Sequence, residues 1–204
     1  MTSSELSALL LLATVSSFTP GPNTTLSTTM AANHGLRHAM RFVCAVPVGW
    51  GLLLTLCALG LGRLVLSWPA LRWAILVTGT AYLLWLARRL WGSRSLLQAD
   101  PSRLQVGFVQ GVGLQFLNIK AWMLALALVG GWIAGREDAL ERTLVLLPIM
   151  VAYGFVSNLT YAMAGSMLRH WLARGERLLV FNRLMALALA VTAVWMVMGA
   201  LQTA

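Results

Sequence analysis

Apolar residues dominate six segments of this chain, and short polar or basic stretches separate these segments. A helix that crosses the hydrocarbon core of a membrane needs about 20 predominantly apolar residues. The pattern therefore predicts an all-α membrane protein with six transmembrane helices, at residues 6–31, 42–61, 73–91, 106–134, 143–167 and 178–201. The loops leave no room for a soluble domain. We expect residues 1–204 to form a single membrane domain, with halves at about residues 1–95 and 103–204.

Two of the six segments are long because a polar stretch interrupts each of them. The first stretch reads Phe18-Thr-Pro-Gly-Pro-Asn23 and the second reads Gln115-Phe-Leu-Asn-Ile-Lys120. Asn23 and Asn118 are 95 positions apart (118 − 23), close to half of the 204-residue chain. Hydrocarbon offers no water to backbone polar groups, so such breaks survive only where they are buried in protein or line a cavity. Paired breaks in two halves of a chain are typical of a transporter's substrate site near the membrane midplane.

The first break combines three residues that oppose a continuous helix. Pro20 and Pro22 supply no backbone N–H and clash with the preceding turn, while Gly21 between them tolerates strained angles. We therefore predict an unwound turn and a new half-helix that starts at Asn23. Asparagine is a favoured N-cap, and a helix N-terminus attracts a carboxylate. The alternative is a simple proline kink whose free carbonyls are bridged by neighbouring helices.

The second break carries a charge deep inside an apolar segment. Lys120 lies 14 residues after Val106 (120 − 106), about 21 Å along a helix. A charge near the membrane centre costs at least ~2.5–3.5 kcal/mol unless it faces protein or a wet cavity. Gln115 and Asn118 nearby favour an interior position, where the ammonium would bind a substrate carboxylate or change its protonation state. The alternative is that Lys120 snorkels to the external headgroups.

The fifth segment carries a polar stripe. Tyr153, Ser157 and Tyr161 recur at helical spacing, with Asn158 beside them. Such a stripe lines a substrate cavity or forms hydrogen bonds between helices, and the sequence leaves both alternatives open.

Composition and charge agree with a membrane protein. Hydrophobic residues make up 59% of the chain and charged residues 10%, against about 25% in soluble domains. The net charge of +9 does not indicate nucleic-acid binding, because the basic residues lie at the ends of apolar segments and form no clustered face.

The odd-numbered loops contain ten arginines: Arg37, Arg41, Arg88, Arg89, Arg94, Arg103, Arg169, Arg174, Arg177 and Arg183. The even-numbered loops contain four: Arg63, Arg72, Arg136 and Arg142. This bias predicts cytoplasmic odd loops and two periplasmic termini.

The residues also argue against several other functions. All six acidic residues fall outside the interiors of the predicted spans, so a buried carboxylate proton relay is not expected. The sequence has no hydrolase triad, no metal-ligand cluster and no phosphate-binding glycine loop. We therefore expect no enzyme activity, no metal and no cofactor. Cys44 and Cys57 lie 13 positions apart (57 − 44) in one segment, too far along a helix for a disulfide.

These features together resemble the LysE/RhtB family of bacterial amino-acid exporters over nearly the whole chain. The motifs that carry the resemblance are the Pro20-Gly-Pro-Asn23 block, Gly35 with its following basic residues, Gly79-Thr-Ala-Tyr-Leu-Leu-Trp-Leu86, and Gly107-Phe-Val-Gln-Gly111 leading to Asn118-Ile-Lys120. The resemblance implies a six-helix exporter of the bacterial inner membrane with inverted three-helix repeats, proton antiport and homodimers. Ile119 stands where the family usually has proline, so we expect a less sharply broken fourth helix.

The sequence thus predicts a secondary transporter that exports an amino acid or a related small metabolite. The half-helix at Asn23 and the ammonium of Lys120 would hold the substrate carboxylate, while the two three-helix units rock around this point. The other predicted binding residues are Pro20, Gly21, Pro22, Gln115, Asn118, Tyr153, Asn158 and Tyr161. A small-solute channel and a non-transporting membrane assembly subunit are the alternatives. Polar residues concentrate in the first, fourth and fifth spans, which favours a localised site over a continuous pore.

Overall fold

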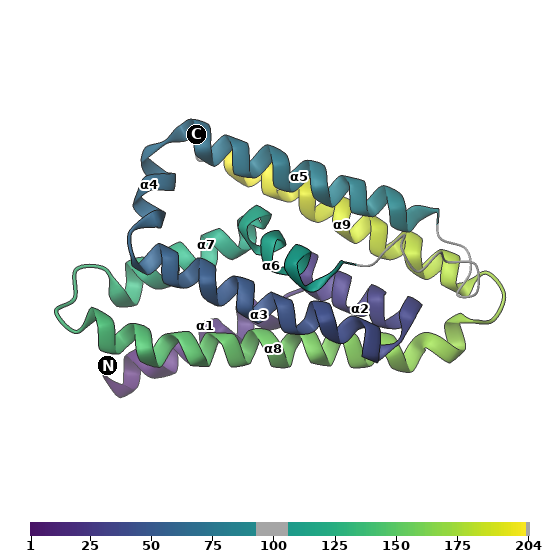
Figure 1. Ribbon diagram of the computed structural model, residues 1–204, viewed down its shortest axis with the longest axis horizontal. Coiled ribbons are helices and arrows are strands. Elements are labelled where there is room, and N and C mark those ends of the chain that lie inside the picture. Colours follow the sequence, from purple (N-terminus) through teal and green to yellow (C-terminus); the bar gives the residue numbers. More distant parts are fainter. Residues whose placement is uncertain (93–105, 203–204) are drawn as a thin grey trace.

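The computed structural model describes residues 1–92 and 106–202, and these residues form helices joined by short connections (Figure 1). The helices are α1 (Ser3–Phe18), α2 (Pro22–His34), α3 (Leu36–Ala58), α4 (Leu61–Ser67), α5 (Pro69–Trp91), α6 (Phe108–Leu117), α7 (Ile119–Leu128), the π-helix η1 (Val129–Ile133), α8 (Ala139–Leu172) and α9 (Arg177–Gln202). The predicted all-α class is confirmed for the described residues. Arg94, Arg103 and the boundaries of the two predicted halves lie outside them.

Four helices are individually long and apolar enough to cross a membrane: α3, α5, α8 and residues 177–199 of α9. A fifth span is formed if α6 is taken together with α7 and η1, which follow it after a bend of 68°. The remaining predicted span corresponds to α1 and α2. Helix α1 is apolar but has only 16 residues, and α2 buries most of its polar side chains in the protein.

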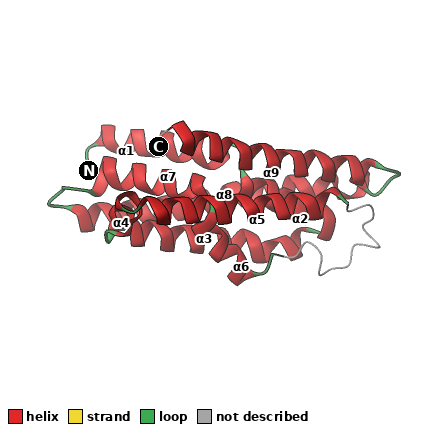
Figure 2. Ribbon diagram, turned by 90° about the horizontal axis from the view of Figure 1, so that it is seen from above, coloured by secondary structure: helices red, strands yellow, loops and turns green. Residues whose placement is uncertain are grey.

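The principal helix contacts join the two halves of the chain. Helix α2 packs on α8, α3 packs on both α8 and α6, and α5 packs on α9. Figure 1 shows α5 and α9 lying along one another, on the far side of α6 and α7 from the α3–α8 layer. Figure 2, seen from above, shows α3, α8 and α9 lying along the long axis of the molecule. The halves therefore interleave and share their apolar cores.

Glycines let these helices meet backbone to backbone. A Cβ atom at Gly49 in α3 would collide with Val112 in α6, and one at Gly165 in α8 would collide with Thr28 in α2. At Gly79 in α5, a Cβ atom would collide with the carbonyl oxygen of Leu117. Leu117 is the last residue of α6, so the second break is held directly against α5. Small residues at such contacts are typical of helix packing in membranes.

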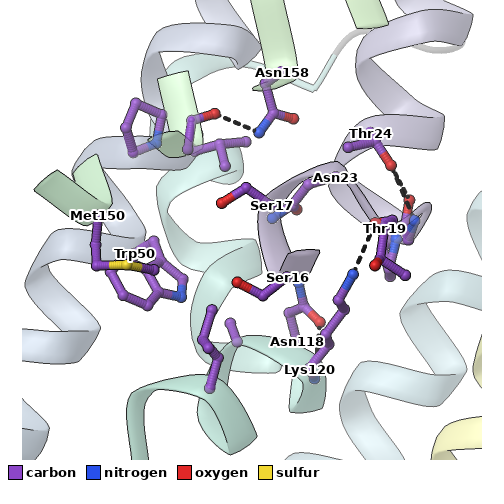
Figure 3. A pocket seen from close by; sticks show the side chains of 17 residues that line it. Ser16, Ser17, Thr19, Asn23, Thr24, Trp50, Asn118, Lys120, Met150 and Asn158 are labelled. Carbon is purple, nitrogen blue, oxygen red and sulfur yellow. Dashed lines mark hydrogen bonds between the residues drawn. The ribbon is translucent and has the colours of Figure 1, made fainter. Parts of the chain in front are cut away.

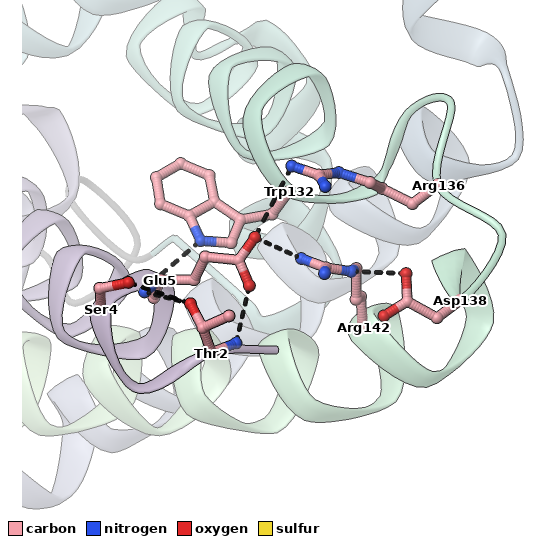
Figure 4. A network of polar contacts seen from close by, with 7 residues as sticks. All are labelled: Thr2, Ser4, Glu5, Trp132, Arg136, Asp138 and Arg142. Carbon is pink, nitrogen blue, oxygen red and sulfur yellow. Dashed lines mark hydrogen bonds and ion pairs between the residues drawn. The ribbon is translucent and has the colours of Figure 1, made fainter.

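An ion network ties the start of α1 to the start of α8 (Figure 4). The Glu5 carboxylate lies 3.1 Å from Nη1 of Arg142 and 3.6 Å from Nη2 of Arg136, and Nε of Arg142 lies 2.7 Å from Asp138. The Thr2 backbone N–H and the Arg142 guanidinium lower the pKa of Glu5 from 4.5 to about 2. The hydrogen bond from Arg142 also lowers the pKa of Asp138. This network fixes α1, which otherwise has few packing partners, against the second half of the chain.

Candidate functional site

The first break is an extended connection between α1 and α2. Helix α1 ends at Phe18, Gly21 is the N-cap of α2, and Pro22 is its first residue. Proline is well suited to that position, because its missing N–H would have had no partner there. The prediction that the half-helix starts at Asn23 was therefore wrong: Asn23 lies inside the first turn. Its side chain does not cap the helix and bonds to Gln115 instead.

The second break is a bend at Asn118. This residue is the N-cap of α7, and its side-chain oxygen accepts a hydrogen bond from the backbone N–H of Lys120 at 3.1 Å. The expectation that Ile119, in place of proline, would leave the helix less broken was wrong, since α6 and α7 meet at 68°. The cap at Asn118 and the close contact of Leu117 with Gly79 maintain the bend without a proline.

A reciprocal pair of side-chain amides joins the two breaks. Nδ2 of Asn23 donates to Oε1 of Gln115 at 2.8 Å, and Nε2 of Gln115 donates to Oδ1 of Asn23 at 3.2 Å. Nε2 of Gln115 also donates to the carbonyl of Gly111 at 3.1 Å. Gln115 is fully buried, so these bonds replace all of its contact with water. The pair therefore holds the start of α2 against α6.

Three side chains satisfy the last carbonyls of α1, which have no partner within the helix. The Ser157 hydroxyl donates to the carbonyl of Ser17 at 2.5 Å, and the Tyr161 hydroxyl donates to that of Phe18 at 2.9 Å. Nζ of Lys120 donates to the carbonyl of Thr19 at 2.9 Å.

Lys120 thus points into the first break and away from a snorkelling position. Its ammonium lies at the negative end of the α1 dipole, where a cation is stabilised.

A cavity of about 80 Å³ lies between the two breaks (Figure 3). Six of the ten predicted site residues line it: Gly21, Pro22, Asn23, Asn118, Lys120 and Asn158. Trp50 and Met150 form a wall on the opposite side of the cavity from Lys120 and Thr19 (Figure 3). The cavity therefore offers hydrogen-bonding groups and one cation on one side and an apolar surface on the other.

The other four predicted residues are not among the described residues that line the cavity. Gln115 supports Asn23, and Tyr161 caps α1. The Tyr153 hydroxyl lies 3.3 Å from Oγ1 of Thr14, while Pro20 is exposed within the first break. Both tyrosines therefore contact α1 rather than the cavity.

Sequence reasoning missed several lining residues. The polar ones are Ser16, Ser17, Thr19 and Thr24. Their clustering on both sides of the Pro-Gly-Pro block was a usable signal. Trp50 and Met150 gave no such signal, because both are ordinary residues in apolar segments and only tertiary packing brings them to the breaks.

The chemistry of the lining fits an anionic or zwitterionic group. Lys120 is the cation among the described lining residues, and none of those residues is acidic. Backbone N–H groups at the start of α2 lie at the positive end of that helix, which favours a carboxylate. Within the described residues, no group of three or more histidine, cysteine, aspartate or glutamate side chains could hold a metal ion.

Several known proteins are similar to this chain along most of its length. The chain is similar to the cysteine/O-acetylserine efflux protein of Klebsiella pneumoniae subsp. pneumoniae, with 31% identity over 87% of this chain and 91% of the relative. It is also similar to the proteins of that name from Salmonella typhimurium (strain LT2), at 29% identity, and Escherichia coli (strain K12), at 28%. Both alignments cover 95% of this chain and 98% of the relative. No solved structure matches the chain.

The sequence model of the family described as LysE type translocator matches residues 14–199, which include both breaks and every described residue that lines the cavity. This match confirms the resemblance drawn from the Pro-Gly-Pro block and the Asn118-Ile-Lys120 motif. The chain therefore belongs to the LysE type translocator family, whose members are transporters and not enzymes.

Proposed function

We propose that this protein is a secondary transporter that exports amino acids or related small metabolites across the bacterial inner membrane. The observation that carries the proposal is the cavity at the junction of two broken helices, with the Lys120 ammonium directed into it. The names of the relatives, cysteine/O-acetylserine efflux proteins, support a small amino acid as substrate. A cavity of about 80 Å³ with an apolar wall at Trp50 and Met150 suits a compact, uncharged side chain.

In this proposal the substrate carboxylate competes for Lys120. Without substrate, the ammonium is bonded to the carbonyl of Thr19. A carboxylate near the start of α2 would attract both the ammonium and the first N–H groups of that helix. The amino group of the substrate would then find acceptors in the side chains of Asn23, Asn118 and Asn158. Gly21 and Pro22 shape the turn, while Pro20, Gln115, Tyr153 and Tyr161 hold the elements that carry these groups.

The proposal includes six crossings in a 3+3 inverted repeat, with α1 and α2 together forming the first crossing. The packing supports this symmetry, because α2 packs on α8 as α6 packs on α3. The arginine bias supports periplasmic termini.

Proton antiport and a homodimer are further parts of the proposal. Lys120 is the titratable side chain in the described cavity lining, so it is the candidate carrier of the coupling proton.

An export assay tests this function. Cells that express the protein should release more cysteine, O-acetylserine or another small amino acid into the medium than cells with an empty vector. Lys120→Met should accumulate in the membrane normally, because it removes an intramembrane charge, yet it should abolish the export. Arg63→Gln, which removes an exposed charge outside the cavity, is the matched control and should export normally.

The same assay addresses the two alternative functions. Export that saturates with internal substrate and disappears when the proton gradient is collapsed supports a transporter, whereas non-saturating flux supports a channel. Full export by Lys120→Met would show that the cavity is not the substrate site. If no solute is exported above the vector control, the assembly-subunit alternative is favoured.

A further inference from the structure

A second cavity lies on the other side of α7 from the first. It has a volume of about 340 Å³ and is lined by α4, α5, α7 and α9. Lys120, Ala121 and Leu124 of α7 line the substrate cavity, whereas Ile119, Trp122 and Met123 line the second one. Helix α7 therefore separates the two cavities and presents one face to each.

The lining of the second cavity is apolar except for one cation. Side chains such as Val65, Ile75, Ile119 and Met196 form most of its wall, and Arg72 in the first turn of α5 is its charged residue. Arg72 is only partly exposed, and its side chain makes no hydrogen bond or ion pair with any described residue. A partly buried guanidinium beside an apolar cavity favours an anionic partner, because an anion is a strong acceptor for its N–H donors.

The rim of this cavity is apolar and exposed, as expected for a surface that faces a bilayer. Leu66, Met123 and Trp195 belong to its lining and are 60%, 58% and 58% exposed. The helices that form the cavity include α5 and α9, both of which are long and apolar enough to span a membrane. A ligand that enters from this side comes from the hydrocarbon region and must itself be largely apolar.

We propose that this cavity binds an anionic phospholipid, with an acyl chain inside the cavity and the headgroup phosphate on Arg72. Arginine binds phosphate through two parallel hydrogen bonds, and an arginine near the end of a span lies at headgroup level. A second copy of the chain fits less well. A two-fold interface would bring two copies of the same patch together, and no acidic residue in the described lining would pair with Arg72.

A lipid in this cavity would contact α7, the helix that also lines the proposed transport site. An acyl chain against Ile119 presses on the residue that precedes Lys120, at the bend between α6 and α7. The bound lipid would therefore stabilise the position of α7 and with it the position of the Lys120 ammonium.

The test measures phospholipid retention by the purified full-length protein in detergent, using native mass spectrometry. After exchange into mixed lipid, we expect one phosphatidylglycerol per chain to be retained in preference to zwitterionic phosphatidylcholine. Arg72→Gln should lower this retention about fivefold, the order expected for one basic side chain at an anionic membrane surface. Arg63→Gln is the matched control, because Arg63 is exposed and does not line the cavity.

A second pair of variants tests the cavity itself. Ile75→Trp should fill the space and abolish retention, whereas Val77→Trp, on the same helix but outside the lining and 60% exposed, should retain the lipid. Soluble glycerol phosphate should not displace the lipid, since it lacks the acyl chain. Equal retention by Arg72→Gln and the parent would overturn the proposal. Equal binding of both lipids would also overturn it. The same holds for a dimer in which a second copy of the chain, and not a lipid, covers the cavity.

Discussion

Lys120 is placed between two helix ends of opposite electrostatic character. It is the second residue of α7, where a positive charge is disfavoured, but its side chain extends to the last carbonyls of α1, where a positive charge is favoured. The ammonium is thus held by a single neutral carbonyl and by a dipole. A carboxylate is a stronger acceptor than a carbonyl, so a substrate carboxylate could replace the Thr19 carbonyl as the acceptor for the Lys120 ammonium.

The amide pair of Asn23 and Gln115 supplies the first prediction. Gln115→Leu leaves the amide of Asn23 without its partner, and a lost partner for a buried polar group costs roughly 1–3 kcal/mol. We expect this variant to melt at a lower temperature in detergent than the parent. The double variant Asn23→Leu/Gln115→Leu should recover part of the loss, because it removes both polar groups. A double variant whose destabilisation equals the sum of the two single ones would show that the pair is not coupled.

Helix α1 ends in a way that explains why the first break is tolerated in a membrane. The carbonyls of its last two residues, Ser17 and Phe18, and of its C-cap residue Thr19 receive hydrogen bonds from Ser157, Tyr161 and Lys120, respectively. The break is therefore a contact point for α7 and α8. The bridged carbonyls alone would also fit a proline kink, but the extended backbone at Thr19 and Gly21 interrupts the helix, which a kink would not do.

Straightening this element is the second prediction. Pro20→Ala/Pro22→Ala restores two backbone donors and removes two ring clashes, so α1 and α2 should join into a more regular helix. The carbonyls that now bond to Lys120 and Tyr161 would turn into that helix, and the cavity would lose one of its walls. We expect a folded protein, with thermal stability in detergent equal to or above that of the parent, that does not export. Export at the parental rate would show that the break is dispensable.

The sequence located both breaks because each combines residues that oppose a helix or cap one. It placed the N-cap of α2 at Asn23, two residues after the observed Gly21 (23 − 21), since asparagine is the commoner N-cap and Gly21 has no capping side chain. It underestimated the bend at Asn118 because the contact of Leu117 with Gly79 depends on a helix 38 residues earlier (117 − 79). The tyrosine stripe of α8 was recognised, but its hydrogen bonds to α1 are a product of tertiary packing.

At the scale of the whole molecule, the ion network at Glu5 gives a prediction about pH. The pKa of Glu5 is lowered to about 2, so its contribution to stability is fully present above pH 4.5 and is lost as the pH falls toward 2. Asp138 acts in the same direction. We expect the melting temperature of the parent to fall over this interval. Glu5→Gln should melt lower at neutral pH and depend less on pH. Parallel pH profiles for the two proteins would contradict this role.

The pairing of helices across the two halves was not visible in the sequence. Periodicity and breaks define each helix, but which helices become neighbours depends on surfaces such as Gly165 against Thr28. The prediction that two three-helix units rock around the substrate site stays a prediction. The structure pairs α2 with α8, α3 with α6 and α5 with α9. Two units that rock without breaking these pairs would each contain helices from both halves.

This interleaving has a consequence for assembly of the chain during synthesis. The first half of the chain is synthesised before α8 and α9, which are the main packing partners of α2, α3 and α5. These three helices therefore complete their packing only after α8 and α9 have been inserted into the membrane. Two separately encoded fragments, residues 1–92 and 106–204, should each be degraded when produced alone and should accumulate together when co-expressed. Quantifying both fragments in isolated membranes would measure this complementation. Stable accumulation of the first fragment alone would mean that its helices find sufficient partners among themselves.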